Sequence, residues 1–172
     1  MVIVLMGVKG AGKTTIGTLL AERLGWKFAD ADSFHPAANV QKIHQGIPLD
    51  DSDREPWLNA LSAAITGWIT QKENVVLACS ALKRAYRTTL GVEASREVKV
   101  VYLKGAYDLI YQRLTLRHEH FATEAILASQ FADLEEPQDA TASDPASTIV
   151  VDVGHPLREI VAEIQVRLNL AS

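Results

Sequence analysis

The sequence predicts an α/β fold, a five-stranded parallel sheet with helices on both of its faces. Five short apolar runs rich in β-branched residues alternate with stretches in which apolar residues recur at helical spacing. Such alternation is typical of parallel sheets, because a right-handed crossover must join each strand to the next. A glycine-rich turn follows the first run directly, and in this fold class ligands bind beyond the carboxyl ends of the strands.

The first predicted unit is a strand, a loop and a helix. Residues 2–6 (VIVLM) form a continuous apolar run, which indicates a strand buried on both faces. Residues 14–24 place four apolar side chains on one helical face, and Gly25 suits the left-handed residue that ends a helix. A short second strand is expected at residues 27–29.

Two helices are expected before the third strand. Pro36 opens the first of them, and Gly46 closes it. The second is long. Residues 50–53 supply acids and a hydroxyl for its first turn, and apolar residues then recur at helical spacing from Trp57 to Ile69. We expect Trp57 to pack in the core rather than to stack on a nucleobase.

The second half of the chain repeats the strand and helix pattern. Residues 75–79, 98–103 and 148–153 are three further β-branched runs, and each precedes a helical pattern of roughly ten residues or more. Residues 135–147 are rich in Pro, Ala, Ser and Asp, which indicates a surface loop.

The composition is consistent with one domain spanning residues 1–172. The chain is 48% hydrophobic and has a formal net charge of -4, enough apolar material for one substantial core. The negative charge predicts no broad attraction for nucleic acid or anionic membranes. Cys79 is the only cysteine, and the first apolar run is far too short for a membrane span, so we expect a cytoplasmic protein.

The strongest functional signal is the glycine-rich run after the first strand. It consists of Gly7, Val8, Lys9, Gly10, Ala11, Gly12, Lys13 and Thr14, followed by Thr15. This order matches G-x-x-x-x-G-K-[ST], the phosphate loop of P-loop NTPases, between the strand and helix that the motif requires. Main-chain N–H groups and the helix N-terminus would surround phosphate oxygens. We therefore predict a P-loop NTPase fold that binds nucleotide phosphates, with a ligand-free glycine turn as the structural alternative.

Within this loop, the side chains have separate expected roles. Lys13 is expected to reach the β and γ phosphates, and the Thr14 hydroxyl is expected to ligate Mg²⁺. Lys9 either touches phosphate or is simply solvated.

Two carboxylates follow the second predicted strand. Asp30 and Asp32 alternate along a segment that we expect to be extended, so their side chains should point to opposite sides and hold different roles. We assign Asp32 to an acceptor hydroxyl and Asp30 to the neighbourhood of Mg²⁺. Helix capping or solvation is the alternative for both acids. The sequence has no guanine-reading N-K-x-D motif, which favours a small kinase over a GTPase.

Three long motifs then identify a family. The runs "GVKGAGKTTIG", "DADSFHPAANVQKIHQGIPLDDSDREPWL" and "CSALKRAYR" closely resemble those of bacterial-type gluconokinases, in the shikimate-kinase-like group of P-loop kinases. The resemblance continues through "YLKG", "RLTLRHEHF", "SQFADLEEP" and "VVDVGHPL", nearly to the end of the chain. Lys9 and Ala31 stand where the family often has Ser and Gly, and neither change removes a reacting group.

The resemblance implies transfer of the ATP γ-phosphoryl group to the 6-hydroxyl of D-gluconate, giving 6-phosphogluconate and ADP. Asp32 matches the family acid that orients the acceptor hydroxyl and accepts its proton. His35 and Asn39 lie beside it in the sequence and are candidates for binding polyol hydroxyls. The resemblance also suggests a homodimer.

Three basic residues match the family's motifs and are candidates for the gluconate carboxylate. They are Arg54, Lys83 and Arg87, of which the arginines are able to grip a carboxylate bidentately. The alternative for Arg54 is a salt bridge to Asp50, Asp51 or a nearby Glu. For Arg87 the alternative is a solvated helix face.

Residues 113–135 are expected to form a small mobile lid. Arg113 and Arg117 lie one helical turn apart within it, and in related kinases a lid arginine closes over the transferring phosphates. We assign Arg117 to that contact, with a solvated basic helix end as the alternative. His118 and His120 lack the i, i+4 spacing of a zinc helix.

Two rival functions remain open from the sequence. One is a kinase for another small acceptor, such as shikimate or a nucleoside monophosphate. The other is a non-catalytic nucleotide-dependent switch, which would retain Lys13 but would have no use for Asp32.

Overall fold

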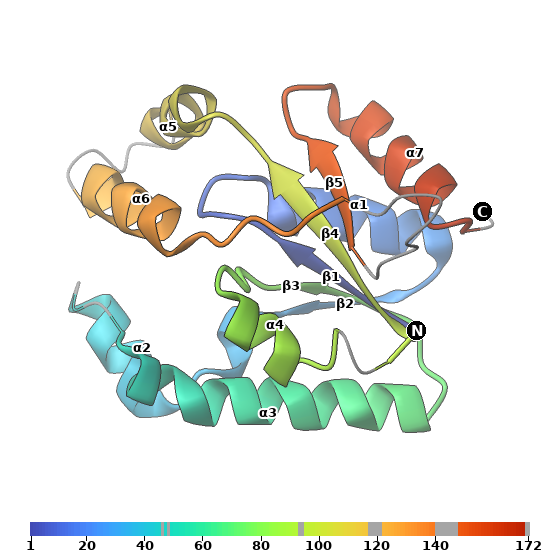
Figure 1. The fold of residues 1–172 in the computed structure, drawn as a ribbon, viewed down its shortest axis with the longest axis horizontal. Coiled ribbons are helices and arrows are strands. Elements are labelled where there is room, and N and C mark those ends of the chain that lie inside the picture. Colours follow the sequence, from blue (N-terminus) through green and yellow to red (C-terminus); the bar gives the residue numbers. More distant parts are fainter. Residues whose placement is uncertain (46, 48, 93–94, 117–121, 140–147, 171–172) are drawn as a thin grey trace.

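All five predicted strands belong to a single parallel sheet. The computed structural model describes residues 1–45, 47, 49–92, 95–116, 122–139 and 148–170. The strands are β1 (Val2–Met6), β2 (Lys27–Asp30), β3 (Val75–Ala78), β4 (Val98–Lys104) and β5 (Thr148–Asp152). Their order across the sheet is β2-β3-β1-β4-β5 (Figure 1). The predicted α/β fold with a five-stranded parallel sheet is therefore confirmed.

Helices connect these strands. They are α1 (Lys13–Leu24), α2 (Ala37–His44), α3 (Asp51–Thr70), α4 (Arg84–Thr89), α5 (Tyr107–Thr115), α6 (Ala122–Asp133) and α7 (Leu157–Arg167), with a short 3-10 helix, η1 (Ala31–Phe34). The helix after the third strand was expected to have roughly ten residues, but α4 has six. Among the described residues, no helix is long and apolar enough to cross a bilayer.

The central strand β1 contributes side chains to two hydrophobic layers. Ile3 and Leu5 pack with residues of α1 and α7, whereas Val4 and Met6 pack with residues of α3. This division follows from the strand's period of two, which sends successive side chains to opposite faces. Figure 1 shows α1 and α7 on one side of the sheet and α3 and α4 on the other. The strand is fully buried on both faces, as its continuous apolar run predicted.

Helix α3 begins with a capping box. The Asp50 carboxylate accepts a hydrogen bond from the Asp53 N–H at 2.8 Å, and the Asp53 carboxylate accepts one from the Asp50 N–H at 3.2 Å. Such a cap is typically worth about 1 kcal/mol. It fixes the first turn of α3, which carries Arg54 and Asp51 toward the site described next.

Candidate active site

The phosphate loop leaves the carboxyl end of β1 and ends at the first turn of α1. Gly10 and Gly12 have φ angles of 88° and 93°, a left-handed region that glycine enters without steric cost. A Cβ at Gly10 would also lie 2.8 Å from Leu114 Cγ. The loop is therefore packed closely against α5, and Gly10 is required both by its conformation and by its neighbour.

Lys13 lies across the mouth of this loop. Its Nζ donates hydrogen bonds to the main-chain oxygens of Gly7 at 3.0 Å and Val8 at 3.1 Å. Burial lowers the pKa of Lys13, and the nearby negative charges of Asp32 and Asp30 oppose that shift. Burial also raises the pKa of the Cys79 thiol to about 12, so Cys79 is neutral near pH 7. The two aspartates therefore supply the counter-charge of the ammonium group.

Asp30 ends β2 and caps the turn that follows. Its Oδ1 accepts a hydrogen bond from the Asp32 N–H at 3.0 Å, and its Oδ2 lies 3.4 Å from the Thr14 hydroxyl. The carboxylate thus reaches the first turn of α1 across the end of the sheet. Capping had been named as the alternative role of Asp30, and the structure combines capping with a position beside Thr14.

The expectation that Asp30 and Asp32 alternate along an extended segment was wrong. The strand ends at Asp30, and Asp32 lies inside η1. The backbone turns there because the Asp30 side chain binds the Asp32 N–H, a local bond that competes with extended structure. Asp32 itself is exposed, and within the described part of the chain no donor binds its carboxylate. It is therefore available to a ligand.

Thr14 and Asp30 form a donor pair that suits Mg²⁺. A hydroxyl and a carboxylate are hard oxygen ligands, and Mg²⁺ is usually held by one or two carboxylates together with water and substrate phosphates. Among the described residues there is no group of three His, Cys, Asp or Glu side chains placed to hold a metal. The pair fits a metal ion shared with bound phosphates rather than an all-protein cage.

Trp57 fixes the acidic turn to helix α3. Its Nε1–H donates to the Ala31 oxygen at 2.7 Å in a buried hydrogen bond. Its ring stacks on His35, with centroids 4.6 Å apart and planes 10° apart. The sequence placed Trp57 in the core but missed these contacts, since neither its polar tip nor its partners can be read from helical spacing. Trp57 therefore holds Ala31 and His35, which lie before and after Asp32 in the sequence, in place.

His35 lies beside Asp32 at the end of the same turn. Burial lowers its pKa; Asp32 opposes this effect, and Arg54 adds to it. A neutral imidazole has one donor and one acceptor. Such a group suits a sugar hydroxyl, which both donates and accepts.

Asn39 was predicted to bind polyol hydroxyls, but in the structure its side chain is buried and binds the main chain of α3. It is 4% exposed, and its Nδ2 donates to the Asp53 oxygen at 2.7 Å. The same amide nitrogen lies 3.4 Å from His35 Nδ1. Lys42 adds a salt bridge to Asp53 at 2.6 Å. Asn39 therefore joins α2 to α3 and supports His35, a use that its position in the sequence did not reveal.

Arg54 and Lys83 converge on one carboxylate. Lys83 Nζ lies 2.9 Å from Asp51 Oδ1, and Arg54 Nη1 lies 3.6 Å from the same oxygen. Tyr86 adds its hydroxyl, which donates to Asp51 and accepts from Arg54 Nη1 at 3.0 Å. The salt bridge to Asp51, an alternative for Arg54, is present. Asp133 also lies 4.0 Å from Lys83 Nζ, so two cations meet two carboxylates at this cluster.

Arg87 is turned away from this cluster. It is 7% exposed, and its guanidinium donates to the main-chain oxygens of Ala81 at 3.0 Å, Leu82 at 2.8 Å and Glu135 at 2.9 Å. Both sequence expectations, a substrate carboxylate and a solvated helix face, disagree with this position. The side chain instead ties the end of β3 to the segment after α6. Ala81, one of its acceptors, has a left-handed φ of 44°.

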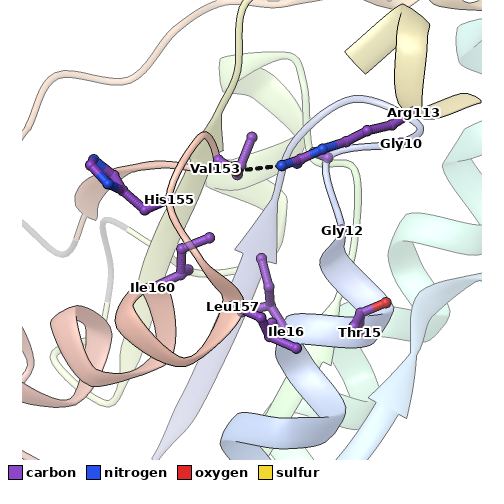
Figure 2. Close-up of a pocket in the computed structure, with 10 residues that line it drawn as sticks. Gly10, Gly12, Thr15, Ile16, Arg113, Val153, His155, Leu157 and Ile160 are labelled. Atoms are coloured by element: carbon purple, nitrogen blue, oxygen red, sulfur yellow. Dashed lines mark hydrogen bonds between the residues drawn. The ribbon is translucent and has the colours of Figure 1, made fainter. Parts of the chain in front are cut away.

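Arg113 lines a second part of the site. Its Nη2 donates to the Val153 oxygen at 2.8 Å, and Figure 2 shows its side chain extending over the phosphate loop near Gly10. A cavity of roughly 170 Å³ lies below it, with apolar walls from Ile16 and Ile160 and with His155 at its rim. Because Gly10, Gly12 and Thr15 of the phosphate loop also line this cavity, it is adjacent to the place where phosphates would bind. Arg117, assigned to the transferring phosphates, lies outside the described residues, as do His118 and His120.

This fold and site define the class of protein. The site has a phosphate loop with its lysine, a hydroxyl and carboxylate pair for a metal, and an acid, Asp32, whose carboxylate has no donor among the described residues. These are the parts of a P-loop kinase acting on a small molecule. The family model described as "Shikimate kinase" matches residues 9–169.

Three similar proteins have gluconokinase in their names. The chain is 41% identical to a probable gluconokinase of Xenopus tropicalis, covering 96% of this chain and 92% of the relative. It is 40% identical to the thermosensitive gluconokinase of Escherichia coli strain K12, covering 93% and 83%. The crystal structure of a gluconokinase from Sinorhizobium meliloti 1021 superposes with a TM-score of 0.82 at 40% identity, covering 97% and 90%. The chain belongs to the gluconokinase family, within the shikimate kinase group.

Proposed function

We propose that this kinase transfers the γ-phosphoryl group of ATP to the 6-hydroxyl of D-gluconate, giving 6-phospho-D-gluconate and ADP. The observation that carries the proposal is the convergence, at the carboxyl end of the sheet, of Lys13, of Asp32, whose carboxylate has no donor among the described residues, and of the basic pair Arg54 and Lys83. Gluconate presents matching groups, because it has a primary hydroxyl at one end and a carboxylate at the other. Relatives named gluconokinase along most of the chain support the same acceptor.

On the nucleotide side, the phosphate loop from Gly7 to Thr15 holds the phosphates and the cavity beside Arg113 takes the base. Lys13 provides positive charge where negative charge develops on the transferring oxygens, which is the largest source of catalysis in reactions of this kind. Release of its hydrogen bonds to Gly7 and Val8 would let the ammonium turn to the phosphates. We retain Arg117 as the lid residue that neutralises the remaining charge.

Thr14 and Asp30 would hold Mg²⁺, which when bound neutralises phosphate charge and orients the β and γ phosphates. The two side chains already approach each other to 3.4 Å. This contact joins the first turn of α1 to the carboxyl end of β2.

On the acceptor side, Asp32 aligns the attacking hydroxyl and accepts its proton. A carboxylate in this role contributes about 10²–10⁴ to the rate. His35 stands beside it as a neutral donor and acceptor for the polyol chain. Because Trp57 holds both Ala31 and His35, the acid and its neighbour move little on binding.

Arg54 and Lys83 bind the gluconate carboxylate in this proposal, with Arg54 able to use two N–H groups. Asp51 holds the two basic side chains together, and the incoming carboxylate would share their N–H groups with it. Arg87 and Asn39 are assigned to holding the framework rather than to the substrate.

The lid proposed for residues 113–135 covers both substrates and excludes water, which would otherwise compete with the acceptor hydroxyl. Leu114 and Leu127, which are buried in the core, anchor the base of this lid. We also propose a single domain, a cytoplasmic location and a homodimer. Light scattering on the purified chain at several concentrations tests the dimer.

The function is tested by measuring ADP release with ATP, Mg²⁺ and a panel of acceptors. The expected result is turnover with D-gluconate far above that with shikimate or a nucleoside monophosphate. Turnover with another acceptor in preference would replace gluconate. Nucleotide binding without acceptor-dependent turnover would indicate a non-catalytic switch.

A further inference from the structure

A glutamine from helix α6 binds the phosphate loop from outside. Gln130 Oε1 accepts a hydrogen bond from the main-chain N–H of Lys9 at 2.5 Å, although 121 positions separate the two residues. Gln130 belongs to the run "SQFADLEEP", to which the mechanism above gives no part. Lys9 is the third residue of the phosphate loop, so this bond reaches the group of N–H donors that surrounds phosphate.

Main-chain hydrogen bonds hold other parts of the loop. The Gly7 N–H donates to the Ser80 oxygen at 3.3 Å, and the Ala11 N–H donates to the Val8 oxygen at 3.2 Å. These bonds fix the loop at its start and at its middle. Between them, the Lys9 N–H is partly buried and is bound by a side chain from a distant element.

Packing determines where Gln130 lies. Leu127, three positions earlier and hence on the same helical face, is fully buried in the same core cluster as Val8 and Ala11. On α5, Leu114 packs against Gly10. Helices α5 and α6 therefore enclose the loop, and the carboxamide of Gln130 has a defined position rather than a free one.

The carboxyl end of α6 is anchored as well. The Glu135 N–H donates to the Leu82 oxygen at 3.0 Å, and Arg87 donates to the Glu135 oxygen at 2.9 Å. Asp133 lies 4.0 Å from Lys83. These contacts bind the helix that carries Gln130 to the end of β3, which is itself paired with β1 and the loop.

We propose that Gln130 is a positioning residue for the phosphate loop, whose carboxamide oxygen holds the Lys9 N–H and thereby keeps the loop in the conformation that receives phosphate. A partly buried N–H that loses its acceptor is costly. Without Gln130, the peptide between Val8 and Lys9 rotates to find another acceptor and turns its neighbours away from the phosphate. The proposal concerns nucleotide binding alone and does not depend on the acceptor being gluconate.

The test compares Gln130→Met, which keeps the length of the side chain but removes its oxygen, with Gln130→Glu, which keeps an acceptor. Gln112→Met on α5 makes the same chemical change at an exposed position and is the matched control. Binding of ADP with Mg²⁺, without any acceptor, is measured by calorimetry, and exchange of the Lys9 amide proton is measured by NMR.

Gln130→Met is expected to bind ADP about tenfold more weakly, which corresponds to the loss of one partly buried hydrogen bond, and its Lys9 amide should exchange faster. Gln130→Glu should retain slow exchange, and any loss of ADP affinity from its added charge should shrink as salt is raised. Gln112→Met should match the parent protein in both measurements.

Three results would overturn the proposal. Unchanged ADP affinity and Lys9 exchange in Gln130→Met would show that the loop holds itself. Tighter ADP binding would show that Gln130 competes with phosphate. A lower Tm with unchanged ADP affinity would reduce Gln130 to a packing residue. Because ADP binding is measured directly, these outcomes differ from a failure of gluconate turnover.

Discussion

Replacing Asp32 by Asn should separate catalysis from stability. The change keeps the size of the side chain and removes its charge and its ability to accept a proton. Asp32 is exposed and receives no described hydrogen bond on its carboxylate, whereas its main-chain N–H is bound by Asp30. The substitution leaves that main-chain bond intact, so the free energy of unfolding should change little.

The size of the catalytic effect follows from the role of the acid. Loss of a general base typically lowers the rate by about 10²–10⁴, or roughly 3–5 kcal/mol in the activation free energy. Asp32 also opposes the lowering of the Lys13 pKa. Its loss lowers the Lys13 pKa further, but Asp30 remains as a counter-charge, so nucleotide binding should be largely retained.

The assay measures kcat with saturating ATP and gluconate, ADP affinity by calorimetry and Tm by thermal unfolding. Asp30→Ala is the informative companion, because it removes both the cap of η1 and the partner of Thr14. We expect Asp30→Ala to lower Tm and Asp32→Asn to leave it unchanged. Normal turnover in Asp32→Asn would refute the assignment of Asp32, and a large drop in its Tm would refute the argument from its exposed carboxylate.

Three further predictions concern the surroundings of Asp32. Arg54→Ala should mainly raise KM for gluconate, because we propose that Arg54 binds the gluconate carboxylate rather than the reacting hydroxyl; an unaltered KM would remove it from the site. Trp57→Phe leaves the Ala31 oxygen without its donor, so unfolding free energy should fall by about 1–3 kcal/mol and kcat should fall with it; a parent-like Tm and kcat would contradict this. His35 has a pKa lowered by burial from its ordinary 6.5. As pH falls below 6.5 the unfolded chain takes up a proton that folded His35 resists, so stability is lost. His35→Gln should therefore show a smaller drop in Tm between about pH 7 and pH 5.5, and equal drops would count against a neutral His35.

The fold was predictable because its signals are local. The run from Val2 to Met6 shows a buried strand without reference to any other residue, since a strand inside a parallel sheet is apolar on both faces. The motif from Gly7 to Thr14 likewise specifies a phosphate loop by its own spacing. The length of α4 was not predictable, because that helix ends where Leu90 meets the core.

The site was predictable as a set of residues but not as a set of contacts. Arg54, Lys83 and Arg87 look alike in the sequence, and each matches a family motif. The structure separates them: Arg54 and Lys83 meet at Asp51, while Arg87 turns inward to three carbonyl groups. Nothing in the spacing of basic residues indicates which carbonyl groups lack a donor.

By itself, the sequence determined the order of strands and helices along the chain, the phosphate loop and the chemical types of the reacting groups, because each depends on neighbouring residues. Only the tertiary structure decided that Asp32 sits in a turn held by Asp30 and Trp57, and that Gln130 contacts the loop from 121 positions away along the chain. Those contacts join distant segments, and their partners are fixed by how the helices pack on the sheet rather than by spacing along the chain.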